Sequence, residues 1–159
     1  KAGFESSVAP QYFAFFDEFL IFLLQVADRI AYRRLSADDR VAFTGTLVNR
    51  VAETQAENRS RLLGVDAAAC KQDFVDRFNE RAGGYAEFDY GDDGPSFRFL
   101  RYLGFCLSGI MDEKDSPWIV DQIMSIQAPE AVDMVEKTMR NLLDEAPRQP
   151  RSRGSTSGD

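Results

Sequence analysis

Four polar side chains in the first half of the chain are the groups best placed to do chemistry. Asp17 and Asp28 are carboxylates within a strongly apolar segment, while Gln55 and Asn58 belong to the inner row of the segment that follows. A buried amide must be hydrogen-bonded or it costs about 1–3 kcal/mol, so an internally paired network is the first interpretation of this set. The alternative is a pocket in which the same four residues orient a small ligand between apolar walls.

A metal site built from carboxylates alone is a further alternative. Asp17 and Asp28 are eleven residues apart in one helical segment, which places them about 16 Å apart along its axis. They cannot share one ion, so each would need carboxylates from other helices to bind Mg²⁺, Mn²⁺ or Ca²⁺. The acidic stretch from Asp89 to Gly94 also departs from a calcium loop, because its twelfth position would be Leu100. We therefore expect no metal and no cofactor.

The residue types that are missing exclude several classes of enzyme. Histidine is absent from all 159 residues, which excludes Ser-His-Asp and Cys-His catalysis and histidine-ligated zinc sites. The sequence contains neither of the glycine-rich motifs that bind nucleotide phosphates. We therefore expect a protein without catalytic activity of its own.

Charge and hydropathy limit the partners and the compartment. The formal net charge is −7, from 19 basic and 26 acidic residues, which argues against nucleic acid as a partner. The cleanest apolar run is six residues, from Phe19 to Leu24, far short of the ~20 residues of a membrane span. Cys70 and Cys106 lie in apolar helical patterns, so we expect free thiols and a cytoplasmic protein.

Helical periodicity runs through nearly the whole chain. Side chains suited to cap a helix stand at Ser36, Asp66 and Ser96, and Gly64 and Gly83-Gly84 are helix-stop signals. Residues 85–95 are rich in turn formers, and Pro129 is expected to end or kink a helix. The predicted helices are Pro10–Arg34, residues 37–63, residues 67–82, residues 97–111, residues 118–128 and Glu130–Glu145.

The fold predicted from this pattern is an all-α compact bundle of five to six helices. Residues 1–146 are expected to form a single helical domain. The remaining segment, residues 147–159, is polar and of low complexity, and it is expected to be a disordered tail. Gly104 lies inside a predicted helix, where glycine costs up to ~1 kcal/mol, so close approach by a neighbouring helix is expected there.

The first predicted helix is apolar around most of its circumference. Its polar residues share one stripe about 120° wide, and the remaining surface carries many phenylalanines. Such a helix must be enclosed on at least two sides, either as the central helix of the bundle or with one flank covered by a second subunit. The candidate interface residues are Phe15, Phe16, Phe19 and Phe22.

These observations favour a non-catalytic protein-interaction module that forms a homodimer. A small-ligand-binding bundle, with its pocket between the first, second and fourth helices, is the principal alternative. The carboxylate-only metal site is the second alternative. The protein partner and the pathway are not specified by any motif in the sequence.

Overall fold

The computed structural model describes residues 2–111, 114 and 116–145, with side chains described from Pro10 onward except at Ser116 and Glu145. Over this part of the chain the protein is an all-α helical bundle, as predicted. The helical elements in chain order are α1 (Ala2–Arg34), α2 (Ala37–Leu63), α3 (Ala67–Tyr85), α4 (Phe97–Ser108), α5 (Ser116–Gln122), the π-helical turn η1 (Ile123–Gln127) and α6 (Ala128–Glu145).

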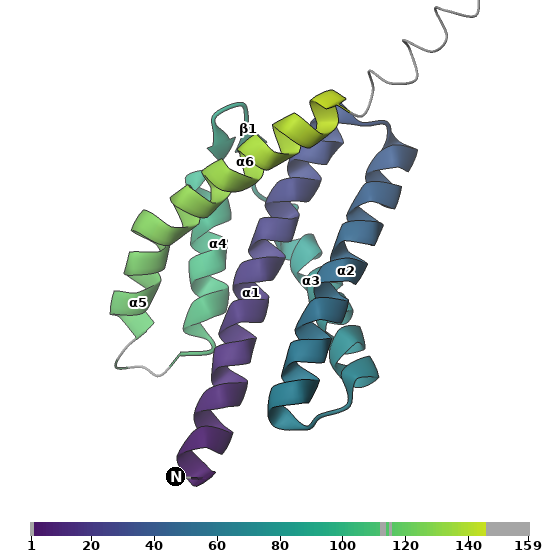
Figure 1. Ribbon diagram of the computed structural model, residues 1–159. Helices are drawn as coiled ribbons and strands as arrows, with labels where there is room; N and C mark the ends of the chain where they lie inside the picture. The colour runs from purple at the N-terminus through teal and green to yellow at the C-terminus, as the bar shows by residue number, and fades with distance from the viewer. Residues whose placement is uncertain (1, 112–113, 115, 146–159) are drawn as a thin grey trace, which may run out of the picture.

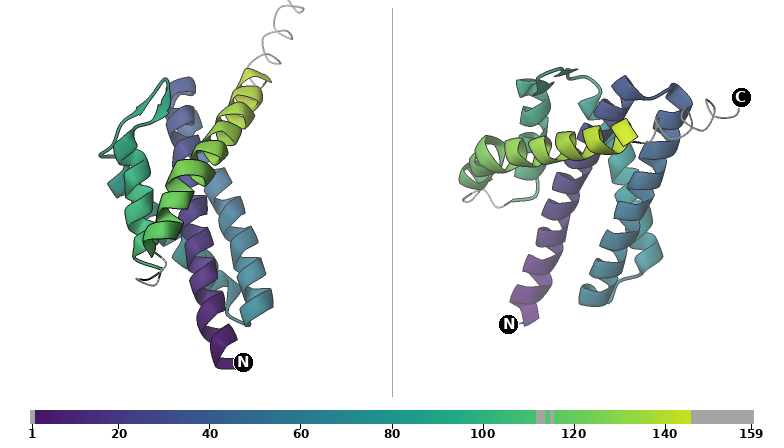
Figure 2. Two further views of the ribbon diagram at one scale, coloured as in Figure 1. Left: turned by 90° about the vertical axis from the view of Figure 1, so that its left-hand side faces the viewer. Right: turned by 45° about the horizontal axis from the view of Figure 1, so that its top comes forward.

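Helix α1 is the central element, which confirms the prediction from its apolar circumference. It contacts α2, α3, α4 and α6. Helices α2 and α3 form an antiparallel pair on one side of α1, and α4 lies on the opposite side (Figure 1). Helix α6 crosses α1 obliquely near the C-terminal end of α1 (Figure 2). A long helix with few polar residues is thereby covered by four neighbours of the same chain.

The core divides into groups of buried side chains that surround α1. Phe22 and Val26 face α4 and α6 together with Tyr85 and Phe99. On the opposite side, Ile21 and Leu24 pack against α2 and α3, with Val48, Ala52, Phe74 and Phe78. A third group joins the C-terminal half of α1 to α6 through Ala27, Ala31, Met139 and Leu143. The helix therefore buries apolar residues on nearly every side, and only its polar stripe interrupts them.

The predicted capping signals at the helix ends are confirmed. The Ser36, Asp66 and Ser96 side chains each accept a hydrogen bond from the backbone N–H three residues later. Gly64 ends α2 in the left-handed conformation, with φ of 70°, and its N–H donates to the Ser60 carbonyl. These local signals fix where α2, α3 and α4 begin, independently of their packing.

Four boundaries differ from the prediction, and one of them is the start of α5, at Ser116 and not at residue 118. Helix α1 begins at Ala2 and includes Pro10, and α3 continues through Gly83 and Gly84 to Tyr85. Helix α4 ends at Ser108 and not near Met111. The two consecutive glycines do not stop α3 because neither adopts positive φ. The low helix propensity of glycine is therefore overridden by tertiary packing, which extends α3 through Gly83 and Gly84.

The predicted break at Pro129 is replaced by a π-helical turn. In η1, the N–H of Ala128 donates to the carbonyl of Ile123, five residues earlier. Pro129 has no N–H to donate, and its ring would crowd the carbonyl four residues before it. The wider turn gives the chain room at this point, so α5, η1 and α6 form one run (Figure 1).

A short antiparallel hairpin stands in the segment where only turns were expected. Its strands are β1 (Tyr90–Gly91) and β2 (Gly94–Pro95), with Tyr90 opposite Pro95. Gly94 adopts φ of 104°, which favours glycine at the turn. The predicted polar tail, residues 147–159, lies outside the described residues.

Gly104 and Gly84 are the two helical glycines that neighbours approach closely. A Cβ built at Gly104 would lie 2.5 Å from the Met124 sulfur and 3.2 Å from a methyl group of Val120. The expected approach at Gly104 therefore exists, and it comes from the side chains of α5 and η1. At Gly84 a Cβ would collide with the Tyr102 hydroxyl, whereas at Gly83 it would meet no atom within 4 Å.

The adjacent glycines of α3 should respond oppositely to the same substitution. Gly83→Ala should stabilise the protein by about 0.5–1 kcal/mol, because alanine is the better helix former and space is available. Gly84→Ala should destabilise it by about 1–3 kcal/mol, because the Tyr102 ring must move. Urea unfolding of both variants measures this, and equal effects at the two positions would contradict the packing described here.

Candidate functional site

The polar stripe of α1 faces α2 and α3. Asp17 accepts a hydrogen bond of 2.8 Å from the Gln55 amide and lies 3.6 Å from the Arg59 guanidinium. Burial raises the pKa of Asp17, and this effect exceeds the opposing effects of the Gln55 hydrogen bond and the Arg59 charge. Asp17 and Gln55 were both candidate ligand residues, and they form a hydrogen bond with each other.

Glu18 is the most deeply buried charged group of the stripe. Only 1% of it is exposed, and Arg81 binds it through hydrogen bonds of 2.6–3.2 Å. Arg77 adds a contact at 3.3 Å. Hydrogen bonding to the Glu18 carboxylate raises the pKa of Arg81. This carboxylate–arginine group fastens α3 to the middle of α1, although the sequence pattern placed Glu18 only within a general polar stripe.

Asp28 belongs to a separate group at the start of α2. Arg40 binds both of its carboxylate oxygens, at 3.0 and 2.6 Å, and the Thr44 hydroxyl donates at 2.7 Å. Hydrogen bonding to Asp28 raises the pKa of Arg40. Asn58 is half-buried on α2. The four candidate ligand residues thus divide between different contacts and do not surround one hollow.

The predicted location of the ligand pocket is not supported by the arrangement of the helices. Helices α2 and α4 lie on opposite sides of α1, so α1 itself fills the space between them (Figure 1). Asp17 instead lines a charged hollow of about 400 Å³ between α1, α2 and α3, with Arg59, Arg77, Asp73, Asp76 and Glu80. Two arginines and four carboxylates therefore line this hollow.

The described residues contain no group of three or more aspartate, glutamate or cysteine side chains placed to share a metal ion. Cys70 is half-buried, Cys106 is buried, and neither forms a disulfide. Burial raises the pKa of the Cys106 thiol to about 11. At neutral pH this thiol is protonated and is a weak nucleophile.

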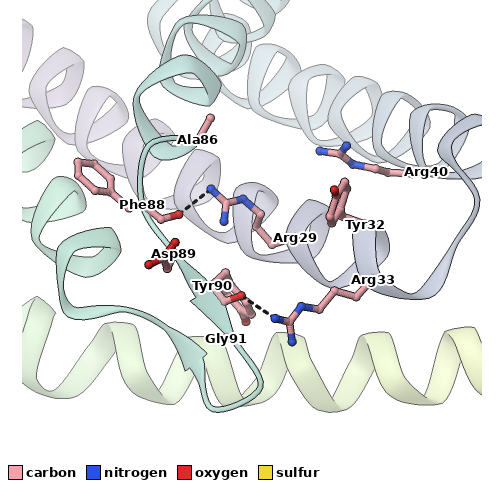
Figure 3. A pocket seen from close by; sticks show the side chains of 9 residues that line it. All are labelled: Arg29, Tyr32, Arg33, Arg40, Ala86, Phe88, Asp89, Tyr90 and Gly91. Carbon is pink, nitrogen blue, oxygen red and sulfur yellow. Dashed lines mark hydrogen bonds between the residues drawn. The ribbon is translucent and has the colours of Figure 1, made fainter.

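A larger hollow, of about 570 Å³, lies at the opposite end of α1 (Figure 3). Arg29 and Arg33, one helical turn apart, reach from α1 toward the segment before and within β1, and Arg40 approaches from α2 beside Tyr32. The remaining lining comes from Ala86, Phe88, Asp89, Tyr90 and Gly91. Three arginines and one carboxylate therefore line a hollow on a chain of net charge −7.

Two of these arginines also hold the 86–91 segment against α1. Arg29 donates to the carbonyls of Tyr85 and Phe88 at 2.6 and 2.9 Å, and its guanidinium lies 5.3 Å from the Phe99 ring centroid. Arg33 donates to the Tyr90 carbonyl at 3.1 Å and pairs with Asp92. The hydroxyl of Tyr90 donates to Glu136 of α6 at 3.1 Å. The hairpin is thereby tied to both α1 and α6.

The candidate interface residues on α1 do not share one environment. Phe22 has no exposed surface and packs against Tyr85 and Phe99, so it is enclosed within the chain. Phe15 and Phe19 are half-buried against the same group. Phe16 is 41% exposed, and its ring lies edge-on to Tyr12 at 4.6 Å. Of the four, Phe16 reaches the surface most fully.

An apolar groove lies beside these exposed rings. It has a volume of about 290 Å³ and is lined by Gln11, Tyr12, Phe15, Met111 and Ile119. The Gln11 amide donates to the carbonyl of Ile110 at 2.8 Å, which ties the N-terminal half of α1 to the end of α4. We call the groove together with the Phe16 ring the α1 apolar surface.

The arginine-lined hollow was not predicted from the sequence. In the sequence, Arg29 belongs to the polar stripe of the first helix, and Arg33 follows it by four residues. Their spacing placed them on one helical face, but Arg40 reaches the same hollow only because the turn at Leu35 and Ser36 reverses the chain direction. The spacing of Arg29 and Arg33 was the one signal in the sequence that pointed to this hollow.

No protein-family model matches the chain, and no curated protein or solved structure is significantly similar to it. Among the helices of the described residues, none combines the length and the hydropathy needed to cross a bilayer.

The raised pKa of Asp17 predicts a pH-dependent effect of its removal. The folded state holds the Asp17 proton more tightly than the unfolded chain does, so the ionised carboxylate lowers stability at neutral pH. Asp17→Asn should therefore be more stable than the wild type at pH 7, and the difference should shrink toward pH 4. Denaturant unfolding at both pH values measures this. The exposed substitution Asp133→Asn is the control, and a difference for Asp17→Asn that grows on acidification would contradict the prediction.

Two buried tyrosines should respond differently to loss of the hydroxyl. The Tyr85 hydroxyl is buried without a hydrogen-bond partner among the described residues, and burial raises its pKa. Tyr85→Phe should leave stability unchanged or raise it by up to about 1 kcal/mol. Tyr90→Phe should lower stability by about 1–2 kcal/mol, because it removes the hydrogen bond to Glu136. Thermal and urea unfolding would test the pair, and a large loss for Tyr85→Phe would show that its hydroxyl is bonded.

Proposed function

We propose that this protein is a non-catalytic interaction module that forms a homodimer through the α1 apolar surface. The observation that carries the proposal is a groove lined almost entirely by apolar side chains, next to two exposed aromatic rings. Tyr12 is 60% exposed and Phe16 is 41% exposed. Adjacent large aromatic residues of this kind contribute strongly to protein interfaces when a partner covers them.

A second copy of the same chain is the occupant that best fits this surface. The surface combines a hollow with protruding rings, so a twofold axis would place the Phe16 ring of each copy against the groove of the other. Among the described residues, no charged side chain lines the groove.

The absence of catalysis is part of the proposal and is supported by how the polar groups are used. Asp17 is bonded to Gln55, Glu18 to Arg81, and Asp28 to Arg40. These carboxylates hold helices together, and such pairing is the usual role of buried polar groups. The two free thiols support a reducing compartment, so we propose that the protein acts in the cytoplasm.

The dimer is tested by light scattering coupled to size exclusion at about 10–100 µM, a range set by typical dimer affinities. The wild type should elute with about twice the chain mass of 17.9 kDa. Phe16→Asp should shift it to the monomer mass, because a carboxylate would be buried in the contact. Phe97→Asp, at an exposed position near the start of α4, is the matched control and should remain dimeric.

Circular dichroism of each variant checks that the fold is retained. Phe16 is 41% exposed in the single chain and is not part of a buried core group, so the helical spectrum of Phe16→Asp should match that of the wild type. A monomeric wild type at the highest concentration would refute the homodimer. Equal dissociation by Phe97→Asp would show that the α1 apolar surface is not the contact.

A further inference from the structure

The arginine-lined hollow at the C-terminal end of α1 has donors that the fold does not use. Arg29 bonds two backbone carbonyls through Nη2 alone, and Arg40 bonds Asp28 through Nε and Nη2. Within the described part of the chain, Nη1 of both arginines makes no hydrogen bond. Because each guanidinium presents its N–H groups in a fixed plane, anchoring one side orients the other side in advance.

Arginines and carboxylates both act on Arg29 at this hollow. Desolvation lowers the pKa of Arg29, and the positive charge of Arg40 lowers it further, while Asp28 and Asp89 oppose this effect. An anion placed beside Arg29 and Arg40 could accept hydrogen bonds from the Nη1 groups of both, which line the same hollow.

The third arginine, Arg33, pairs with a carboxylate that a ligand can displace. Arg33 pairs with Asp92, whose side chain is 98% exposed at the hairpin turn. An exposed ion pair of this kind is worth about 0–1 kcal/mol, so a better anion can replace it. Asp28, by contrast, accepts three hydrogen bonds and is largely covered, so Arg40 remains in place.

The size and the walls of the hollow indicate what kind of anion would fit. Its volume of about 570 Å³ lies in the range of ~300–1,000 Å³ that is usual for small-molecule sites, and it exceeds the needs of an inorganic ion. The exposed Tyr32 and the half-buried Phe88 supply aromatic surface beside the arginines (Figure 3). Arginine pairs phosphate oxygens in a two-bond geometry, and aromatic rings suit a planar organic group.

We propose that this hollow binds a small organic phosphate, with the phosphate held by Arg29, Arg33 and Arg40 and the organic part against Tyr32. Asp92 competes with the ligand for Arg33. The site is at the opposite end of α1 from the α1 apolar surface, so the proposal does not depend on dimer formation.

The probes for this site are adenosine monophosphate, adenosine and inorganic phosphate, titrated into ¹⁵N-labelled protein. The arginine Nε–H signals are followed by NMR. Adenosine monophosphate should shift the signals of Arg29 and Arg33 to saturation, inorganic phosphate should do so more weakly, and adenosine should have no effect. Equal affinities for inorganic phosphate and adenosine monophosphate would overturn the assignment of an organic ligand.

Three variants make the test specific. Arg33→Gln should weaken binding of adenosine monophosphate about tenfold or more, since a charged hydrogen-bond donor is lost. Arg34→Gln changes the net charge equally but lies outside the hollow, so it should change affinity less than about threefold. Asp92→Asn should tighten binding by up to about fivefold, because it releases Arg33.

The outcomes separate the site from general charge attraction. Equal losses for Arg33→Gln and Arg34→Gln would overturn the proposal, because they would show a response to net charge alone. Failure of the wild-type signals to move at about 10 mM probe, where even millimolar affinities saturate, would overturn it as well. Tighter binding by Asp92→Asn together with a selective loss for Arg33→Gln would establish it.

Discussion

The burial of Glu18 in the middle of α1 is the constraint on which the rest of the structure depends. A carboxylate that is 1% exposed must be paired, and loss of one partner from a buried ion pair costs about 3–5 kcal/mol. Within the described part of the chain, α3 supplies those partners, in the register that presents Arg77 and Arg81. Because α2 and α3 pack together, the same constraint brings α2 to Asp17 and Asp28. The polar stripe therefore assigns one side of α1 to this helix pair, and its remaining apolar surface is left for α4 and α6.

This asymmetry gives the two ends of α1 different surfaces. At the C-terminal end, Arg29 and Arg33 satisfy backbone carbonyls of a segment that has few of its own hydrogen bonds, and α6 covers the hairpin from the other side. The result is a polar hollow with unused guanidinium donors. At the N-terminal end the neighbours are the last turn of α4 and the start of α5, and the rings of Tyr12 and Phe16 stay exposed. A basic hollow and an apolar groove thus stand at opposite ends of one central helix.

How well each feature of the fold could be predicted depended on how far apart in the sequence its interacting residues lie. Caps at Ser36, Asp66 and Ser96 depend on a hydrogen bond within three residues, and the sequence identified all of them. The all-α class and the central place of α1 followed from periodicity and from an apolar excess that one neighbour could not cover. The continuation of α3 through Gly83 and Gly84 was not predicted, because the Tyr102 ring from α4 occupies the space where a side chain at Gly84 would lie. The π-helical turn before Pro129 escaped prediction because it is one of several ways in which a helix accommodates proline.

The sequence by itself determined that this chain is a helical bundle around its first long segment, since apolar periodicity and capping are properties of neighbouring residues. It also marked Asp17, Asp28 and Gln55 as polar groups within an apolar surrounding, which need partners wherever they lie. Only the tertiary structure decided that Asp17 meets Gln55 while Asp28 meets Arg40, and that Arg29, Arg33 and Arg40 face one hollow. The physical reason is that helix faces can be read from spacing, whereas the rotation and register of one helix against another depend on the summed packing of side chains far apart in the chain.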